Sequence, residues 1–462
     1  MRNYKKNIYH ITGLLLIMLL LLLGCEKMVE IDDPTDQIST PSVFEDTHTA
    51  DAALANLMAE IRDNSMFSGG SRGMSALLSS YTDDLDGYFI NNNNAAMDIY
   101  HNQQLAGNTS IESLWRNAYK EIYIANSIME GVEGSTSIPV KDRQRIAGEA
   151  MLLRSLIYFN LYRIFGDIPY TVTTDFSINR NLKRIPENEL LAHLENDLQK
   201  SSGMLSDEYS VAERLYPSRK VAQLVLAELY LTEHKWQQAE LMVKEVIGSP
   251  LYVFETDITK VFLKSGKHIL WQLKPQNTGD ATAEALLYYF NNAAPPSYAM
   301  SNNLVSAFSA SDLRKQNWMV PVTFNQQTWY SPYKYKSLSP NTTEHSIVFR
   351  LEQAYCILAE ALAEQGRVGE AVPYINAIRQ RAGLTALGQN IPKDAFLNEL
   401  LQEKRREFFT ESGQRFFDLK RFNRLQDLAV IKPNWKSYHK VWPIPLSELL
   451  LNPNLNPQNE GY

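Results

Sequence analysis

The stretch that decides the fold is "RLEQAYCILAEALAEQGRVGEAVPYINAIRQRAG", residues 350–383. In its first half, apolar residues recur at steps of three and four, which places them on one face of a helix. Gly366 is expected to end this helix, and Gly383 to end a second one that begins near Gly369. Two helices of about a dozen residues joined by a short turn, with alanine where helices approach closely, resemble a tetratricopeptide unit.

The same arrangement recurs along the chain. "SRKVAQLVLAELYLTEHKWQQAELMVKEVIGS", residues 218–249, forms a second pair, and two more are expected between 49–58 and 113–132 and between 147–166 and 187–205. Each helix alone leaves an apolar stripe uncovered, so stacked pairs bury a continuous core. The sequence therefore predicts an all-α, tetratricopeptide-like helical-repeat scaffold of about four helix pairs, with long irregular loop insertions and little strand.

The N-terminal segment indicates export. Residues 11–23 are 13 uncharged residues that follow Arg2, Lys5 and Lys6, whereas a membrane-spanning helix needs about 20 apolar residues. A basic start, a short apolar run and a small residue at its end are typical of a secretory signal peptide, which does not belong to the folded protein. We therefore predict that residues 1–24 are a signal peptide.

Cys25 follows directly in "LLGC", which resembles the bacterial lipobox. The resemblance implies that Cys25 is lipidated and becomes the first mature residue, and several acyl chains make a stable anchor. The alternative is an ordinary secreted protein whose signal ends near a cysteine. Residues 25–41 contain too few apolar residues to form a core and are expected to be a lipid-anchored tether. Residues 42–462 are then a single domain.

Composition narrows the classes of partner. The whole chain has 45 Lys and Arg against 52 Asp and Glu; without the three basic residues of the signal peptide, 42 stand against 52, a net charge near −10. Nucleic acid is therefore not an expected partner. The two cysteines are Cys25 and Cys356, so with the first lipidated no disulfide framework supports the fold. Cys356 lies in an apolar helical stretch and is expected to be a buried small hydrophobe.

Four segments carry a family resemblance that covers nearly the whole mature chain. They are "WRNAYKEIYIAN" (115–126), "EAMLLRSLIYFNLYRIFGDIPY" (149–170), "EKRREFFTESGQRFFDLKR" (403–421) and "VWPIPLSELLLNPNLNPQNEGY" (441–462). In this order, after a lipobox, they resemble the SusD/RagB family. The resemblance implies a surface-exposed outer-membrane lipoprotein that binds a nutrient, a glycan or sometimes a peptide, and delivers it to a SusC-like TonB-dependent transporter.

These segments also have physical interpretations of their own. The charges of "EKRREFF" alternate at helical spacing, which indicates ion pairs on a solvated or interhelical face rather than a nucleic-acid patch. The turn-rich end "NPNLNPQNEGY" is expected to wrap back over the scaffold.

The ligand site is expected where the helical pattern fails, at 63–110 and 250–348. Both stretches interleave aromatic residues with Asn, Gln, Asp and Ser. An aromatic face stacks on the apolar face of a sugar ring, while amides and carboxylates bond to its hydroxyls. Such a site needs neither a metal nor another cofactor. With the resemblance, these stretches give as ligand-binding candidates Tyr81, Tyr88, Asn91, Tyr289, Tyr298, Trp318 and Trp329.

An enzyme is not predicted. Asp83, Asp84 and Asp86 are adjacent loop acids, whereas a glycosidase needs two carboxylates that face each other across the substrate. These acids form either an exposed turn, which the sequence favours, or a calcium site. The histidines show no metalloprotease spacing. Three functions remain open: a nutrient-binding protein, which we favour, a scaffold that binds only another protein, and a hydrolase.

Overall fold

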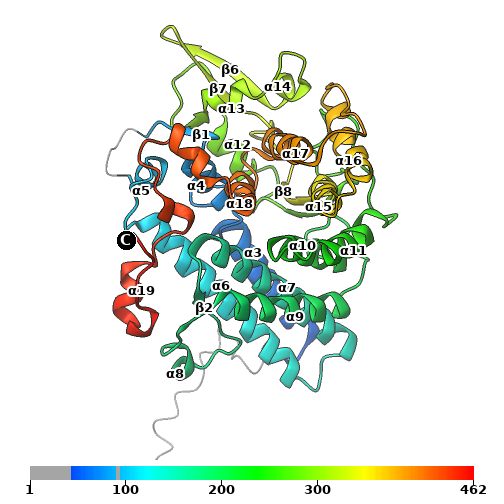
Figure 1. The fold of residues 1–462 in the computed structure, drawn as a ribbon. Coiled ribbons are helices and arrows are strands. Elements are labelled where there is room, and N and C mark those ends of the chain that lie inside the picture. Colours follow the sequence, from blue (N-terminus) through cyan, green and yellow to red (C-terminus); the bar gives the residue numbers. More distant parts are fainter. Residues whose placement is uncertain (1–42, 90–93) are drawn as a thin grey trace, which may run out of the picture.

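The computed structural model describes residues 43–89 and 94–462. Long helices dominate it (Figure 1), and each helix of the main series packs against the next one. This series comprises α3 (Thr47–Asp63), α6 (Thr109–Gly134), α7 (Val140–Phe165), α9 (Glu187–Met204), α10 (Arg219–Thr232), α11 (Trp236–Ile247), α15 (Leu351–Glu364), α16 (Val368–Arg381) and α17 (Lys393–Phe408). All four predicted helix pairs are present, which confirms the helical-repeat scaffold.

Local sequence sets the ends of these helices. Asn108 caps α6 because its side-chain oxygen accepts hydrogen bonds from the amides of Ser110 and Ile111. Gly366 and Gly383 follow α15 and α16 with φ values of 79° and 72°, a left-handed conformation that glycine adopts at little cost. Both predicted helix ends are confirmed.

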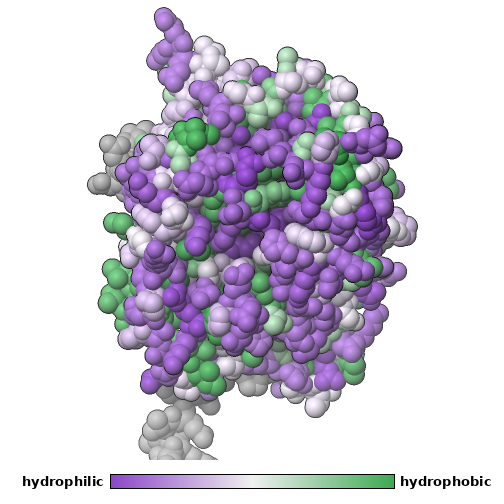
Figure 2. All heavy atoms as spheres, viewed as in Figure 1, coloured by the Kyte–Doolittle hydropathy of each residue, from purple (hydrophilic) through white to green (hydrophobic). Residues whose placement is uncertain are grey.

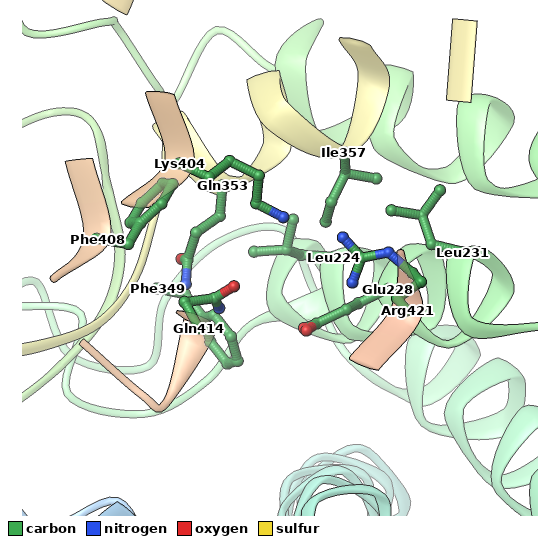
Figure 3. A pocket seen from close by; sticks show the side chains of 10 residues that line it. All are labelled: Leu224, Glu228, Leu231, Phe349, Gln353, Ile357, Lys404, Phe408, Gln414 and Arg421. Atoms are coloured by element: carbon green, nitrogen blue, oxygen red, sulfur yellow. The ribbon is translucent and has the colours of Figure 1, made fainter. Parts of the chain in front are cut away.

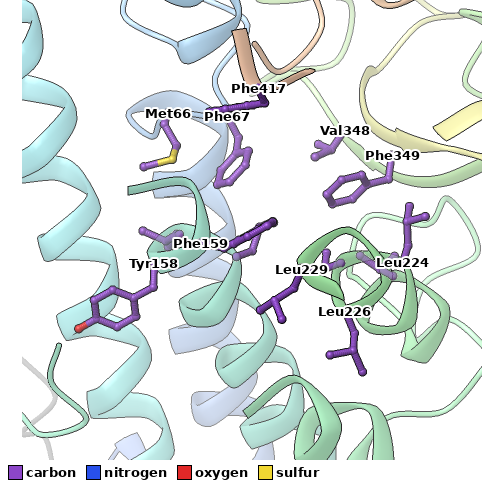
Figure 4. Close-up of a cluster of buried hydrophobic side chains, with 14 of the residues drawn as sticks. Met66, Phe67, Tyr158, Phe159, Leu224, Leu226, Leu229, Val348, Phe349 and Phe417 are labelled. Carbon is purple, nitrogen blue, oxygen red and sulfur yellow. The ribbon is translucent and has the colours of Figure 1, made fainter. Parts of the chain in front are cut away.

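The hydrophobic core runs through the stacked helices and into the insertions. Figure 4 shows buried side chains that meet from five parts of the chain, labelled Met66, Phe67, Tyr158, Phe159, Leu224, Leu226, Leu229, Val348, Phe349 and Phe417. Each large apolar side chain stabilises the fold by about 1.5–3 kcal/mol through its burial. Cys356 belongs to this core, as predicted, and burial raises the pKa of its thiol.

Shorter elements form the insertions and the C-terminal part. The helices are α4 (Met74–Tyr81), α5 (Ala95–Tyr100), α8 (Phe176–Asn179), α12 (Ala283–Tyr288), α13 (Asn302–Ser306), α14 (Leu313–Asn317), α18 (Gln414–Arg421) and α19 (Leu446–Leu451), with 3₁₀ turns η2 (Leu425–Val430), η3 (Ser437–Lys440) and η4 (Pro453–Leu455). The strands form two-stranded antiparallel sheets: β1 (Leu85–Gly87) with β5 (Tyr298–Met300), β2 (Ile168–Pro169) with β3 (Arg184–Ile185), β4 (Ile269–Leu273) with β8 (Ser346–Arg350), and β6 (Met319–Phe324) with β7 (Gln327–Pro332).

The C-terminal segment wraps back over the scaffold, as predicted. The side-chain amide of Asn459 donates to the carbonyls of Phe165 and Trp442, both at 2.7 Å. The hydroxyl of Tyr462 donates to the carbonyl of Val441 at 3.0 Å.

Within the described residues, no helix has both the length and the apolar character needed to cross a bilayer.

A buried charge network ties the long insertion to the repeats. Arg350 at the end of β8 donates to Glu407 of α17 at 2.6 Å, Arg314 of α14 does so at 3.2 Å, and Arg381 of α16 completes the set. Burial opposes ionisation of Glu407, but the three guanidinium groups hold its pKa well below the ordinary value of 4.5. Further carboxylates from Asp312, Glu352, Glu403 and Glu411 pair with the same arginines. The "EKRREFF" charges are thus ion-paired, at a buried interhelical face.

We expect Glu407→Gln to lower the free energy of unfolding by about 3–5 kcal/mol, because the substitution leaves buried arginines without their shared charge. Urea denaturation at pH 7 measures this change. Since the folded-state pKa lies below 4.5, the wild-type contribution is complete above that pH and is lost as the pH falls. Glu370→Gln, an exposed residue of α16, is the control and should change little. A Glu407→Gln protein as stable as the wild type would contradict the network's role.

Candidate ligand-binding site

The two irregular regions expected to carry the site meet in a small sheet. Strand β1 comes from the first region and β5 from the second, and they pair antiparallel with Asp86 opposite Ala299 and Gly87 opposite Tyr298. The amide of Tyr88 extends this pairing by donating to the carbonyl of Ser297 at 2.8 Å. The β6–β7 hairpin packs against β5 in turn. Residues more than 200 positions apart therefore share one surface.

A second ion-pair cluster fixes the first of these regions. Asp84 accepts from Nε of Arg405 at 2.8 Å, and both carboxylate oxygens of Asp83 accept from Arg415, at 2.9 and 3.0 Å. Burial opposes ionisation of Asp83, yet the two arginines lower its pKa. The expectation of an exposed turn is therefore wrong for Asp83 and Asp84, because "EKRREFF" and the following helix supply partners that bury them. Asp86 is partly buried and accepts from the hydroxyl of Tyr100 at 3.2 Å. The same pairs occupy the carboxylates of Asp83 and Asp84, two of the three that the calcium alternative needs.

Three of the predicted ligand residues are core residues. Tyr81 and Tyr298 are 0% exposed and Trp318 is 1% exposed. The hydroxyl of Tyr81 donates to the carbonyl of His439 at 2.9 Å, and Nε1 of Trp318 donates to the carbonyl of Ile258 at 3.2 Å. A ring that is packed on all sides has no face for a sugar. The prediction that Tyr81, Tyr298 and Trp318 contact the ligand is therefore wrong, because their rings are buried.

Tyr88 and Trp329 do lie together near the surface. Both are partly buried, and their rings meet edge to face with centroids 6.2 Å apart and planes at 89°. They pack over a small cluster of Phe290, Ala299 and Val322, which supports the rings from below. Two candidates chosen from different regions of the sequence thus form one aromatic pair. Asn91 and Cys25 lie outside the described residues.

A second aromatic pair is made by Tyr289 and Tyr333. Their centroids are 5.4 Å apart with planes at 34°, and Nζ of Lys336 lies 5.5 Å from the Tyr333 ring. The hydroxyl of Ser331 donates to the carbonyl of Tyr288 at 2.9 Å and so holds the end of α12 against β7. Tyr333 was not among the predicted residues, although it lies in the same aromatic-rich stretch; its partnership with Tyr289 depends on a contact across 44 residues.

The two pairs are spaced along one extended segment. Trp329 and Tyr333 are four residues apart, on the strand β7 and just beyond it, which corresponds to roughly 13 Å at the rise of a β-strand. This separation is wider than a single sugar ring. A ligand that contacts both pairs must therefore be longer than a monosaccharide.

A pocket of about 360 Å³ is lined by parts of the two segments that carry the second pair, although neither tyrosine of the pair lines it. Its wall combines the apolar side chains of Leu286 and Leu338 with polar groups of Arg62, Gln276, Asp280 and Ser339. Leu286 belongs to α12, three residues before Tyr289, and Leu338 follows Tyr333 in the same segment. A concave surface of apolar patches and scattered donors and acceptors is suited to a polyhydroxylated ligand.

Two other hollows are lined by different parts of the chain. One of about 560 Å³ adjoins Phe89 and Asn94, on either side of residues 90–93, and carries Arg72 and Arg116. A cavity between α10, α15, α17 and α18 (Figure 3) measures about 10 Å³, which is about the room that one water molecule needs and far too little for a sugar. No set of three metal-ligating side chains lies within coordinating reach anywhere in the described ranges.

The Asp83 cluster gives a test of how the surface is held together. We expect Asp83→Ala to speed hydrogen exchange in peptides that cover β1 and β5, because the amide of Ser301 donates to the carbonyl of Asp84 beside this cluster. Mass spectrometry measures the exchange rates. Asp427→Ala removes an exposed ion pair with Arg424 and is the control. Unchanged exchange in Asp83→Ala would mean that the cluster does not fix the surface.

Comparisons with known proteins agree with this architecture. A family profile described as "Starch-binding associating with outer membrane" matches residues 34–231, and one described as "SusD family" matches residues 288–462. A SusD-like protein of Formosa agariphila is 23% identical over 95% of this chain and 97% of its own length, and a second one is 25% identical over 97% and 98%.

Solved structures share the fold. A SusD superfamily protein from Bacteroides vulgatus superposes with a TM-score of 0.77 at 20% identity, covering 90% of this chain and 99% of its own. A surface glycan-binding protein from Bacteroides thetaiotaomicron, in complex with laminarihexaose, superposes with a TM-score of 0.75 at 15% identity, covering 89% and 99%. With profiles matching both halves and relatives along its full length, the chain belongs to the SusD/RagB family.

Proposed function

We propose that the protein binds an oligosaccharide or polysaccharide at the surface of the outer membrane and delivers it to a SusC-like TonB-dependent transporter. The observation that carries the proposal is the pair of aromatic platforms, Tyr88 with Trp329 and Tyr289 with Tyr333, on a surface that joins the two loop regions. Binding without catalysis is part of the proposal.

Carbohydrate suits this surface for physical reasons. Sugar rings have apolar C–H faces that pack on aromatic rings, and hydroxyl groups that need donors and acceptors. The platforms supply ring faces, and the pocket lined by Leu286 and Leu338 supplies a guanidinium, an amide, a carboxylate and a hydroxyl. A peptide also contacts aromatic rings, so peptides belong in the test as the alternative ligand.

The location and the partner are proposed on other grounds. The lipobox at Cys25 supports a lipid anchor in the outer membrane, and family membership supports a transporter partner. Two of the solved structures that share the fold are a laminarin-binding SusD-like protein and a surface glycan-binding protein in complex with laminarihexaose. These describe other proteins, and here they serve to choose the first glycan to test.

The proposal predicts retention of a glycan without its cleavage. Mature protein that begins at residue 25 with Cys25→Ser is titrated by calorimetry with laminarin oligosaccharides of increasing length, starch fragments and peptides, and the mixtures are then analysed for products. We expect affinity to rise when the oligosaccharide becomes long enough to reach both platforms. Release of shorter products would establish a hydrolase. If the protein binds none of these ligands but binds the transporter in a separate assay, it is a protein-binding scaffold.

Substitutions locate the binding to the platforms. Trp329→Ala and Tyr333→Ala should each weaken binding of a long oligosaccharide about three- to tenfold, since each removes one stacking surface. Tyr123→Ala removes an exposed tyrosine from α6, outside the platforms, and is the matched control. If both platform variants bind as tightly as the wild type, the ligand lies elsewhere.

A further inference from the structure

Asp86 differs from the two acids that precede it in the sequence. Asp83 and Asp84 are buried and paired with arginines of α17 and α18. Asp86 is partly buried, and among the described residues the hydroxyl of Tyr100 is the one group that donates to it, to Oδ1 at 3.2 Å. No lysine, arginine or histidine in the described ranges forms an ion pair with it. The carboxylate can therefore accept from a further donor.

This carboxylate lies beside the aromatic pair of Tyr88 and Trp329. Asp86 and Tyr88 are two residues apart in extended chain, and side chains at this spacing point to the same face of a strand, roughly 7 Å apart. Ala299, opposite Asp86 in the sheet, belongs to the cluster on which Tyr88 and Trp329 pack. Burial, and then the nearby charge of Asp86, raise the pKa of Tyr88. Asp86 is thus at the edge of this platform.

Tyr100 and Lys432 hold the carboxylate in place. Gly87 allows the approach of Tyr100, because a Cβ atom at this position would lie 3.3 Å from Cγ of the tyrosine ring and crowd it. Nζ of Lys432 lies 4.0 Å from the centre of the same ring and donates to the carbonyls of Ser80 and Tyr100, at 2.7 and 2.9 Å. Lys432 is 7% exposed. Its charge therefore lies behind Tyr100, whereas Asp86 lies beside the rings.

The remaining charges of this region belong to the Asp83 cluster. Lys432 is attracted first by Asp86 and then by Asp83 and Asp84. Arg405 and Arg415 pair with these last two carboxylates. Asp86 is therefore the acid of this cluster that a ligand at the platform meets as a charge.

The chemistry of a carboxylate limits which sugars fit beside it. An ionised carboxylate accepts hydrogen bonds and donates none. Sugar hydroxyls donate to it, whereas the carboxylate of a uronic acid or a sulfate group carries the same charge and is repelled. Figure 2 shows hydrophilic residues over the projecting end of the β6–β7 hairpin. Polar groups beside the rings thus decide which sugars this surface accepts.

We propose that Asp86 is the specificity-determining residue of the platform formed by Tyr88 and Trp329. Its carboxylate accepts hydrogen bonds from the hydroxyl groups of an uncharged sugar and excludes uronic acids and sulfated sugars. Tyr100 is a positioning residue that holds Oδ1 and leaves the second oxygen to the ligand. This inference rests on the proposed function and names the class of glycan, one that is neutral at the unit bound by this platform.

Calorimetry with two matched ligands tests the proposal. One is laminarihexaose, or the neutral oligosaccharide that the wild type retains best, and the other is the same oligosaccharide oxidised at C6 to the uronic acid. We expect the wild type to bind the neutral ligand about tenfold more tightly than the acidic one at low salt, because it alone can donate without repulsion. The difference should narrow as added salt screens the charges.

Substitutions assign this preference to Asp86. Asp86→Asn keeps the shape of the side chain and should weaken binding of the neutral ligand about tenfold, because a charged acceptor is lost. The same substitution should strengthen binding of the acidic ligand, a change that a merely structural role would not produce. Tyr100→Phe should weaken binding of the neutral ligand about two- to threefold and keep the discrimination, because the charge remains. Asp98→Asn removes a charge from α5 and is the matched control, with neither affinity changed.

Two results would overturn the proposal. The wild type binds the neutral and the acidic ligand equally, or its preference for the neutral one is unchanged in Asp86→Asn. The first comparison needs no substitution, so it decides the matter even if Asp86→Asn does not fold. Either result in a protein that retains glycan refutes this inference alone. A wild type that retains no glycan refutes the proposed function, and this inference with it.

Discussion

The convergence of Arg314, Arg350 and Arg381 on the buried carboxylate of Glu407 is the interaction on which the rest of the structure depends. Arg314 and Arg350 belong to the long insertion and its return strand, and Glu407 belongs to the helical repeats. Charges taken out of water are tolerated only when they are fully paired. The insertion therefore has a fixed position on the repeats, because separating these buried ion pairs would cost a large free energy.

Buried ion pairs also fix the position of the ligand surface. In the insertion, Tyr289 directly follows α12, Trp329 lies on β7 and Tyr333 directly follows β7. Asp83 and Asp84 attach the first loop region to the C-terminal helices α17 and α18 through Arg405 and Arg415. Aromatic platforms bind most tightly when they are fixed before the ligand arrives, because less side-chain entropy is lost on binding. The charge clusters thus contribute to binding without touching the ligand.

The repeats could be predicted from the sequence because helical periodicity, alanine positions and terminal glycines are local signals. The site could be predicted only as two regions. Whether an aromatic residue in a loop faces solvent depends on contacts between distant segments. Tyr298 is buried and packs against Phe89 of the other region, with ring centroids 5.0 Å apart. Tyr88, the residue before Phe89, stays partly exposed. The burial of Asp83 likewise depends on arginines more than 300 residues away in the sequence, and no local sequence pattern predicts that contact.

The central claim is that one oligosaccharide lies across both aromatic pairs. A crystal structure of the protein with a laminarin hexasaccharide, or with whichever glycan it retains, tests this claim most directly. The account predicts sugar rings stacked on Tyr289 and Tyr333 and on Tyr88 and Trp329. Sugar bound against the helical repeats, with both aromatic pairs unoccupied, would contradict it.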